Sequence, residues 1–342
     1  MYKEGIVWMY AMLLVLLSSC QNRPQYDLFT SYGWEDFGEP IKLTGHSIDF
    51  DEEVKNPTSL LVVDSFLLTK NYYLDKSFLI YNLNSKKKQG ERIVVGNGPN
   101  EMVDPIWLRF SDDELGILDR EQRRLDVYNQ AEFLTLNAPT PYKSFPIKEL
   151  LINPAVVPGL GFVSATFNTQ GKLVAYDFDG NLISYFGSYP EGYEEYPIIN
   201  KFTWFEHSFA VQPEGTHFIV AHMRTDMLEF YDKDLKMFRR IQGPDGYYPA
   251  IDRSMEPRYT YFSPESTKDC FYVLYDGRVL DINASDRYLR KHLLAFDWEG
   301  NPLKHYELSE GIITFSIDYE NNVLYGVTDY PEFHIVAFPM NE

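Results

Sequence analysis

The clearest pattern along the chain is a short apolar phrase that occurs six times. Each copy has an aliphatic or aromatic start, a strand-like middle, then Phe or Tyr, then Asp, Asn or Pro. The copies are FLIYN (78–82), LDVYN (125–129), LVAYD (173–177), LEFYD (228–232), LLAFD (293–297) and IVAFP (335–339). They begin 47, 48, 55, 65 and 42 residues apart. A recurrence at this spacing indicates internal structural repeats.

Between the copies, short runs rich in Val, Ile, Leu, Phe and Tyr are separated by Asp, Asn and Gly, as in SLLVVDSFLLT (59–69). Such runs are typical of β-strands, and no long stretch has a helical period. Four strands with their turns fill roughly 50 residues, and radial repetition of four-stranded units makes a β-propeller. The pattern therefore predicts an all-β, six-bladed β-propeller of four-stranded antiparallel blades over residues 37–342, with the repeated phrase as strand 3.

The last copy ends close to the C-terminus, so the sixth blade lacks a fourth strand. The segment GEPIKLTG (38–45) is strand-like and precedes the first blade. We expect this N-terminal strand to close the ring and to remove an exposed sheet edge.

The first twenty residues predict an export signal and a lipid anchor. The apolar run from Ile6 to Leu17 is too short to span a bilayer, which needs about 20 residues, and follows a charged start, as in secretory signals. The ending Leu17-Ser18-Ser19-Cys20 resembles a bacterial lipobox. We therefore expect a signal peptide over 1–19, lipid attachment at Cys20 and a tether over 20–36. The alternative is an ordinary signal peptide with an unrelated cysteine.

Residue 21 is Gln rather than the Asp that resembles an inner-membrane retention signal. We therefore expect an outer-membrane lipoprotein that faces the periplasm, with surface display as the alternative. The net charge of −19 argues against nucleic acid, which is bound mainly through Lys and Arg. The only other cysteine, Cys270, has no disulfide partner once Cys20 is lipidated. We expect a monomer without a cofactor, held to the membrane by its N-terminal lipid.

The phrase VVGNGPNEMVDP (94–105) follows the fourth strand of the first repeat. It resembles a junction of TolB-like and NHL-like six-bladed propellers, and more closely a family of propeller lipoproteins of Bacteroidota. The resemblance extends over 37–342 and the lipobox. It implies a fold and a location but no reaction. Read locally, Gly96 and Gly98 are expected to permit positive φ in a turn between strands.

The lengths of the connecting segments predict a binding face. In a propeller, the links after strands 2 and 4 lie on one face, and the phrase that forms strand 3 is followed by tight turns on the other. The long links are expected to share the first face; they are 137–154, 188–208, 243–261 and 276–292. Long loops are often functional. The candidate ligand-binding residues on them are Trp204, His207, Tyr247, Tyr248, Arg258 and Tyr261, since amphipathic rings suit glycan or peptide contacts. The alternative is that these rings pack the loops onto the blades.

No linear catalytic motif was found. DFDGN (177–181) reads as a hairpin turn rather than a calcium loop. His222 and Arg224 share a strand face and could line the channel, while Glu101 and Arg109 flank the start of the second blade. Two functions remain open. One is a non-enzymatic envelope lipoprotein that binds a glycan, peptide or protein partner; the alternative is a hydrolase or lyase with a polar or metal site in the central channel.

Overall fold

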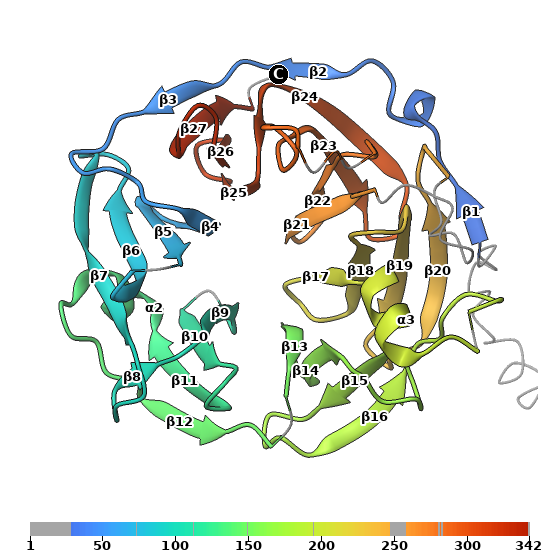
Figure 1. Ribbon diagram of the computed structural model, residues 1–342, viewed down its shortest axis with the longest axis horizontal. Helices are drawn as coiled ribbons and strands as arrows, with labels where there is room; N and C mark the ends of the chain where they lie inside the picture. The colour runs from blue at the N-terminus through green and yellow to red at the C-terminus, as the bar shows by residue number, and fades with distance from the viewer. Residues whose placement is uncertain are drawn as a thin grey trace, which may run out of the picture.

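Six sheets, the blades, stand around a central axis. The strand with which the chain enters each blade's consecutive run of strands lies nearest the axis (Figure 1). The computed structural model describes residues 29–340 except 73, 112, 149, 194, 247–257, 280 and 282. The predicted six-bladed β-propeller with four-stranded antiparallel blades is confirmed. Extra strands enlarge three of the sheets.

The strands of the first three blades follow one another along the chain. Blade 1 consists of β4 (Pro57–Val63), β5 (Phe66–Asn71), β6 (Lys76–Asn82) and β7 (Lys87–Val95), with a short β8 (Glu101–Met102) parallel to β7. Blade 2 consists of β9 (Pro105–Arg109), β10 (Glu114–Asp119), β11 (Arg124–Asn129) and β12 (Lys143–Pro146). Blade 3 consists of β13 (Ile152–Val157), β14 (Gly161–Ala165), β15 (Leu173–Tyr176) and β16 (Leu182–Phe186).

The remaining blades continue the order, and the last one is completed by an N-terminal strand. Blade 4 consists of β17 (His207–Val211), β18 (His217–His222), β19 (Met227–Asp232) and β20 (Met237–Gln242). Blade 5 consists of β21 (Tyr261–Ser266), β22 (Cys270–Tyr275), β23 (Arg290–Asp297) and β24 (Pro302–Ile312). Blade 6 consists of β25 (Thr314–Asp318), β26 (Val323–Thr328), β27 (His334–Pro339) and β3 (His46–Ile48).

The repeated apolar phrase forms the third strand of every blade, as predicted. A third strand has sheet neighbours on both sides and packs on adjacent blades with both faces. It is therefore buried without alternation, as the run Ser77–Tyr81 of β6 shows, and reads as a continuous apolar run.

The hydrophobic core is divided into six layers, one between each pair of neighbouring blades. Aromatic rings fill these layers. Between blades 3 and 4, for example, Phe218 stacks on Tyr231, and Phe186 meets both rings edge-on. The high aromatic content of 16% is thus largely explained by packing between blades.

The N-terminal segment forms a belt around the outside of blades 4, 5 and 6 (Figure 1). β1 (Phe29–Ser31) pairs in parallel with β20, and β2 (Ile41–Leu43) pairs in parallel with β24. Ring closure by an N-terminal strand is confirmed, but the closing strand is β3 and not the segment 38–45. That segment contains β2, which pairs with β24 of blade 5 instead. Its Leu43 packs there into the layer between blades 5 and 6.

The belt also begins earlier than expected. The 3₁₀-helix η1 (Trp34–Phe37) links β1 to β2, and Tyr32 and Phe37 are buried against Phe296. Residues 29–36 therefore already pair with or pack on the blades. The propeller begins earlier in the chain than the expected boundary at residue 37.

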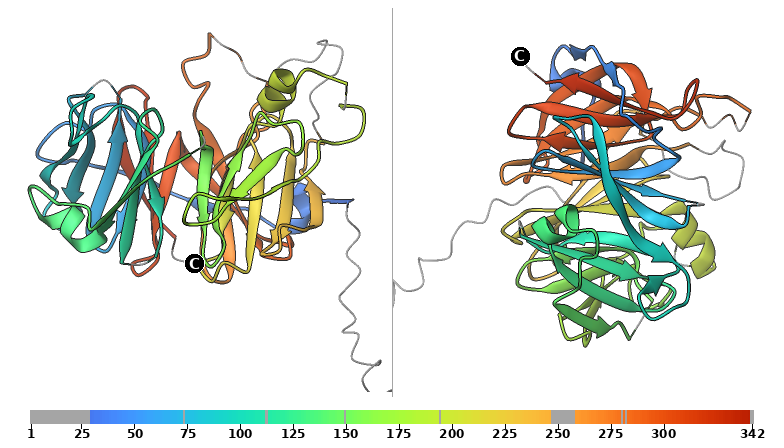
Figure 2. Two further views of the ribbon diagram at one scale, coloured as in Figure 1. Left: turned by 90° about the horizontal axis from the view of Figure 1, so that it is seen from below. Right: turned by 90° about the vertical axis from the view of Figure 1, so that its left-hand side faces the viewer.

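The two faces of the disc differ (Figure 2). The face with the links after strands 2 and 4 is called the long-loop face here, and the opposite one the turn face. The long-loop face carries α3 (Ile198–Trp204) and the described residues of two further links, 243–246 with 258–260 and 276–279 with 283–289. The fourth long link, 137–154, was placed wrongly. Its first part follows α2 (Gln130–Thr135) between strands 3 and 4 of blade 2, so it lies on the turn face. Asp177 caps a tight turn by accepting hydrogen bonds from the amides of Asp179 and Asn181, which confirms the predicted hairpin.

Candidate binding site

A channel along the axis opens on both faces and is lined by the first strands of the blades. Its turn-face part has a volume of about 370 Å³ and its long-loop part about 570 Å³. The two parts share Pro154, Phe209 and Pro264 among their walls, so they meet along the axis. The long-loop part is called the mouth below. Three long links each contribute to its wall, with Glu206, Tyr259 and Tyr288.

The mouth combines charged groups with aromatic rings. Its charged residues are Glu206, Arg224 and Arg290, and its rings include Tyr259, Phe262 and Tyr288. Two arginines and one glutamate leave a single positive charge on its wall. This contrasts with the net charge of −19 of the whole chain.

Arg224 is held in place at the rim. Its Nε lies 3.1 Å from Glu206 Oε2, and its Nη2 donates to the Tyr259 hydroxyl at 3.3 Å. The guanidinium also lies over the Tyr259 ring at 4.7 Å. Arg224 was expected to line the channel together with His222; Arg224 does line the mouth, whereas His222 is buried inside blade 4.

Arg290 forms the inner wall of the mouth and is only 3% exposed. Its guanidinium carbon lies 3.5 Å from the centre of the Phe262 ring, and its Nη1 donates to the carbonyl of Tyr288. Its Nε is buried without a hydrogen-bond partner in the described part of the chain. Burial, only partly offset by the charge of Asp276, lowers the pKa of Arg290 to about 10.

The aromatic rings of the link 188–206 mostly pack α3 onto blade 4. Tyr193 is buried at 5% exposure, and its ring contacts both Trp204 and Phe205. Trp204 is half-buried and also contacts Tyr196. For these rings the structure supports the alternative of loop packing, although part of the Trp204 side chain remains exposed to solvent.

Arg258 lies near the end of the link before blade 5, and Tyr261 is the first residue of β21. Tyr261 is fully buried, and its hydroxyl lies 2.6 Å from the hydroxyl of Tyr32 in the belt. It was wrong to expect it on the binding face, because it belongs to the layer between blades 4 and 5. Arg258 donates from Nη1 to the carbonyl of Gly277 at 2.7 Å and so connects two long links.

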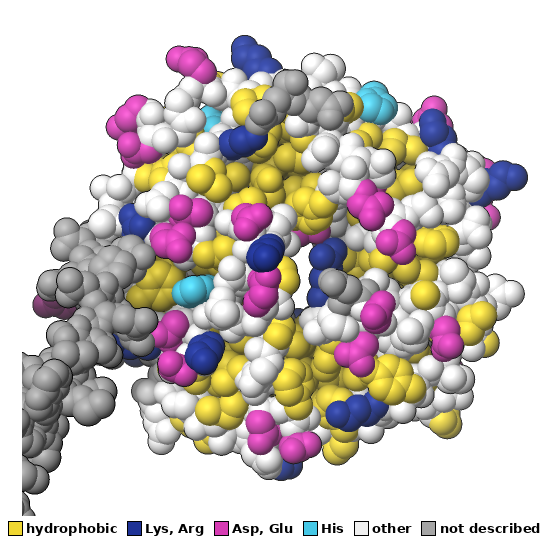
Figure 3. Space-filling model, turned by 180° about the vertical axis from the view of Figure 1, so that it is seen from behind, with side chains coloured by type: hydrophobic (Ala, Val, Ile, Leu, Met, Phe, Trp, Pro, Cys, Tyr) yellow, Lys and Arg dark blue, Asp and Glu magenta, His cyan; other side chains and the backbone are white. Residues whose placement is uncertain are grey.

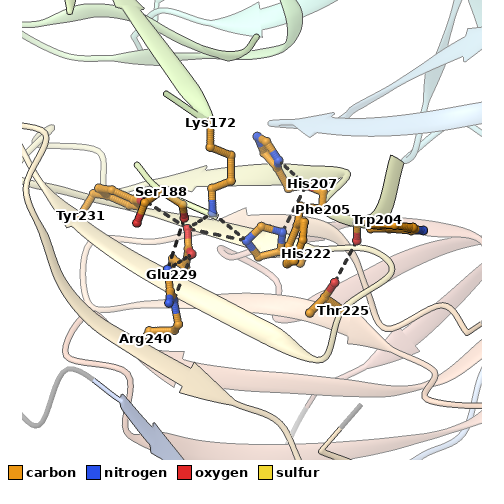
Figure 4. A network of polar contacts seen from close by, with 10 residues as sticks. All are labelled: Lys172, Ser188, Trp204, Phe205, His207, His222, Thr225, Glu229, Tyr231 and Arg240. Carbon is orange, nitrogen blue, oxygen red and sulfur yellow. Dashed lines mark hydrogen bonds and ion pairs between the residues drawn. The ribbon is translucent and has the colours of Figure 1, made fainter. Parts of the chain in front are cut away.

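A network of buried charges ties blade 3 to blade 4 beneath α3 (Figure 4). Lys172, just before β15, forms an ion pair with Glu229 of β19 and lies 3.4 Å from His222 Nε2. Arg240 of β20 donates to the other Glu229 oxygen at 2.8 Å, and the Tyr231 hydroxyl donates at 3.0 Å. Burial alone would raise the pKa of Glu229, but Lys172, His222 and Arg240 hold it well below its usual range. The carboxylate is therefore ionised and fully bonded.

His207 and His222 face each other across β17 and β18. Their Nδ1 atoms lie 2.8 and 3.2 Å from the same acceptor, the carbonyl oxygen of Phe205. Burial, with the nearby His222, lowers the pKa of His207 to about 3; burial, with Lys172, lowers that of His222 to about 4. Both rings are inside the blade at 3% and 0% exposure. Their expected place on the binding face or in the channel is therefore wrong.

A different charge pair lies at the turn-face end of the channel. Figure 3 shows the opening at the centre of this face with basic and acidic side chains at its edge. Arg109 Nη2 lies 3.3 Å from Glu265 Oε1. Glu265 accepts further hydrogen bonds from Ser316 Oγ at 3.0 Å and Ile317 N at 2.8 Å, which ties blade 5 to blade 6. Burial raises the pKa of Glu265.

Glu101 is not brought together with Arg109. Its carboxylate accepts from the amide of Gly98 at 2.8 Å, at the outer edge of blade 1. Gly96 and Gly98 are not among the positive-φ glycines, so that expectation was wrong. A Cβ on Gly96 would instead stand 2.1 Å from Glu101 Oε2, so the glycines leave room for this carboxylate.

Three of the predicted residues lie outside the described part of the chain: Cys20, Tyr247 and Tyr248. Within the described residues there is no group of three or more His, Cys, Asp or Glu side chains that could hold a metal. Among these residues there is also no helix long and apolar enough to cross a membrane.

Sequence reasoning missed Arg290, Lys172 and Glu229. A usable signal was present in the repeat itself. A charged residue stands one to three positions before the apolar phrase in five of the six copies: Lys76, Arg124, Lys172, Asp226 and Arg290. These residues lie at or just before the start of strand 3, and three of them, Lys172, Asp226 and Arg290, are buried.

The chain belongs to the TolB-like six-bladed propellers, since the family model described as "TolB-like 6-blade propeller-like" matches residues 36–320. The resemblance to TolB-like propellers noted from the sequence is thereby confirmed. A search among curated proteins gave no match.

Two solved structures from Bacteroides share the fold. A member of the DUF4221 family from Bacteroides vulgatus is 11% identical with a TM-score of 0.58, covering 88% of this chain and 96% of that one. A protein of Bacteroides fragilis described as exported is 12% identical with a TM-score of 0.55, covering 91% and 98%. At these identities the likeness concerns the fold alone.

Proposed function

We propose that this propeller is a cell-envelope lipoprotein without catalytic activity, which binds a glycan, peptide or protein partner at the mouth. The observation that carries this proposal is Arg290, a buried cation without an acidic partner among the described residues, in the wall of an open cavity of about 570 Å³. Ligand sites are typically concave, with a few polar groups among apolar and aromatic walls. The mouth has this composition.

The path of the belt supports an anchor on the far side from the mouth. β20 runs from the turn face toward the long-loop face, and β1 runs parallel to it, with Phe29 opposite Arg240 and Ser31 opposite Gln242. The chain therefore joins the disc from the turn-face side. Cys20 precedes Phe29 by nine residues, a span of at most about 30 Å. A lipid at Cys20 would leave the mouth directed away from the membrane.

The exported Bacteroides fragilis neighbour adds support for the location. The anchor is tested by Cys20→Ser. This variant should lose metabolic labelling with palmitate and should leave the membrane fraction. Labelling that persists in the variant would refute lipid attachment at this residue.

Binding at the mouth is tested by thermal unfolding of the protein from residue 21 to 342 with a panel of envelope glycans and peptides. A ligand at a hundred times its dissociation constant adds about 2.7 kcal/mol of stability, which is easily measured as a rise in Tm. Thr58 is exposed and lines the mouth, so Thr58→Trp narrows the cavity without entering the core. Hits that this variant abolishes support the proposal; hits that it leaves unchanged place the binding elsewhere.

The alternative of a hydrolase or lyase in the channel has no specific observation in its favour. The charged residues of the turn-face cavity are Arg109 and Glu265, and the ion pair between them joins the blades. It stays a prediction from the fold alone.

A further inference from the structure

Arg290 is a charge that the protein buries without neutralising it. It is 3% exposed, and no ion pair of the described residues includes it. Asp276 is near enough to influence it electrostatically, but Asp276 itself pairs with Arg278 at 2.6 Å. Burying an unpaired cation is costly, and the Phe262 ring at 3.5 Å offsets only part of that cost.

The unused hydrogen-bonding capacity of Arg290 points the same way. Its Nε is a buried donor without a partner in the described chain, and of its other nitrogens Nη1 bonds the Tyr288 carbonyl. An unmade hydrogen bond at a buried charged group costs more than at a neutral one. An anion in the mouth would compensate the charge of the guanidinium, which lines that cavity.

The charge balance of the mouth indicates one negative charge on that anion. Arg224 is already paired with Glu206 at 3.1 Å, so Arg290 supplies the uncompensated charge. A planar guanidinium fork matches a carboxylate in two parallel hydrogen bonds. Apolar walls beside it, Met223 and Ile313, and the rings of Tyr259 and Tyr288 suit the carbon body of an organic acid better than a small inorganic dianion.

We propose that the mouth binds the carboxylate of an organic monoanion through Arg290, with Arg224 and the Tyr259 hydroxyl at the rim as secondary contacts. This inference rests on the proposed function, because it names the chemical class of the ligand at that same site. The carboxylate could belong to an acidic sugar or to the end of a peptide, and the two sources are distinguished by the probes.

The test is isothermal titration of the protein from residue 21 to 342 with galacturonate, N-acetylalanine, galactose and inorganic phosphate. One or both carboxylates should bind, and galactose and phosphate should bind at least tenfold more weakly. Binding of galacturonate alone assigns an acidic sugar, and binding of N-acetylalanine alone assigns a peptide end. If neither carboxylate binds, or if phosphate or galactose binds equally well, the proposal is overturned.

Variants separate the site from the rest of the surface. Arg290→Gln should weaken carboxylate binding at least tenfold, the loss expected for a hydrogen bond to a charged group, and Arg290→Lys should recover only part of it. The matched control is Arg123→Gln, which removes the same charge at an exposed position of blade 2 on the long-loop face. This variant should bind like the unmodified protein. Equal affinity of the protein and Arg290→Gln would overturn the proposal.

Circular dichroism and Tm identify variants that fail to fold. Should Arg290→Gln be unfolded, Arg224→Gln replaces it, with an expected several-fold loss; unchanged affinity in that variant would count against the proposal. A failure of all carboxylate probes, with ligand hits that Thr58→Trp still abolishes, would refute the carboxylate and leave the proposed function standing. Hits insensitive to Thr58→Trp would refute the proposed function itself.

Discussion

The buried histidine pair predicts that acid weakens the fold between pH 6.5 and pH 4, above the range in which ordinary carboxylates titrate. His207 and His222 have pKa values lowered to about 3 and about 4 in the folded protein, against about 6.5 in an unfolded chain. Between pH 6.5 and pH 4 the unfolded chain therefore binds more protons. The free energy of unfolding must fall as the pH falls through this window.

The magnitude follows from these values. At pH 5, protonation of one such histidine in the unfolded chain lowers the free energy of unfolding by about 2 kcal/mol relative to pH 8, so the pair contributes about 4 kcal/mol. Burial raises the pKa of Asp226 to about 6 in the folded state. Protonation of this carboxyl stabilises the folded protein at pH 5 and offsets about 1 kcal/mol of the loss. His292 and His305, whose pKa values burial also lowers, add to the loss.

The contribution of one ring is isolated by His207→Phe. This variant loses the hydrogen bond to the Phe205 carbonyl but also removes the unpartnered Nε2. Its stability difference between pH 8 and pH 5 should be about 2 kcal/mol smaller than that of the unmodified protein. Urea unfolding at the two pH values, followed by tryptophan fluorescence, measures this difference.

Phe209→Leu is the control for the same blade, because the Phe209 ring lies 5.0 Å from the His207 ring and does not titrate. It should lower the stability equally at both pH values. If His207→Phe keeps the full pH dependence of the unmodified protein, the reasoning about the buried pair is refuted.

Two further predictions concern the buried charges and the belt. Glu229→Gln leaves Lys172 and Arg240 without their shared carboxylate and should cost about 3–5 kcal/mol in urea unfolding, part of which Lys172→Met in the same chain should restore; a loss below about 1 kcal/mol would contradict the role of Glu229. A protein starting at residue 38 lacks the rings of Tyr32 and Phe37, each contributing about 1.5–3 kcal/mol of burial, so its Tm should lie clearly below that of a protein starting at residue 29. Equal Tm values would show that residues 29–37 do not stabilise the propeller.

The blades could be predicted from the sequence because their third strands are buried on both faces. A strand without a solvent side reads as an unbroken apolar run, and its regular return fixed the number of blades. The closing strand was assigned wrongly because β2 and β3 are each only three residues long. At that length, the choice of sheet depends on which groove accepts a side chain such as Leu43, and local sequence does not reveal this.

The candidate site was predictable only in part. The positions of three of the four long links on one face followed from strand order, but α2 and the segment after it come before the fourth strand of blade 2, which the link 137–154 had been expected to follow. Burial was the main source of error. His207, His222 and Tyr261 were chosen for their chemistry, although their side chains are directed into the protein interior and are buried. Arg290 was overlooked because a charge next to an apolar strand normally marks a solvated end.

The central claim is that the mouth holds an organic carboxylate. The most direct measurement is a crystal structure of the protein from residue 21 to 342 soaked with whichever of galacturonate or N-acetylalanine binds more tightly. The account predicts a carboxylate in the mouth within hydrogen-bond distance of the Arg290 guanidinium. Density for the acid at another surface, with the mouth unoccupied, would contradict it.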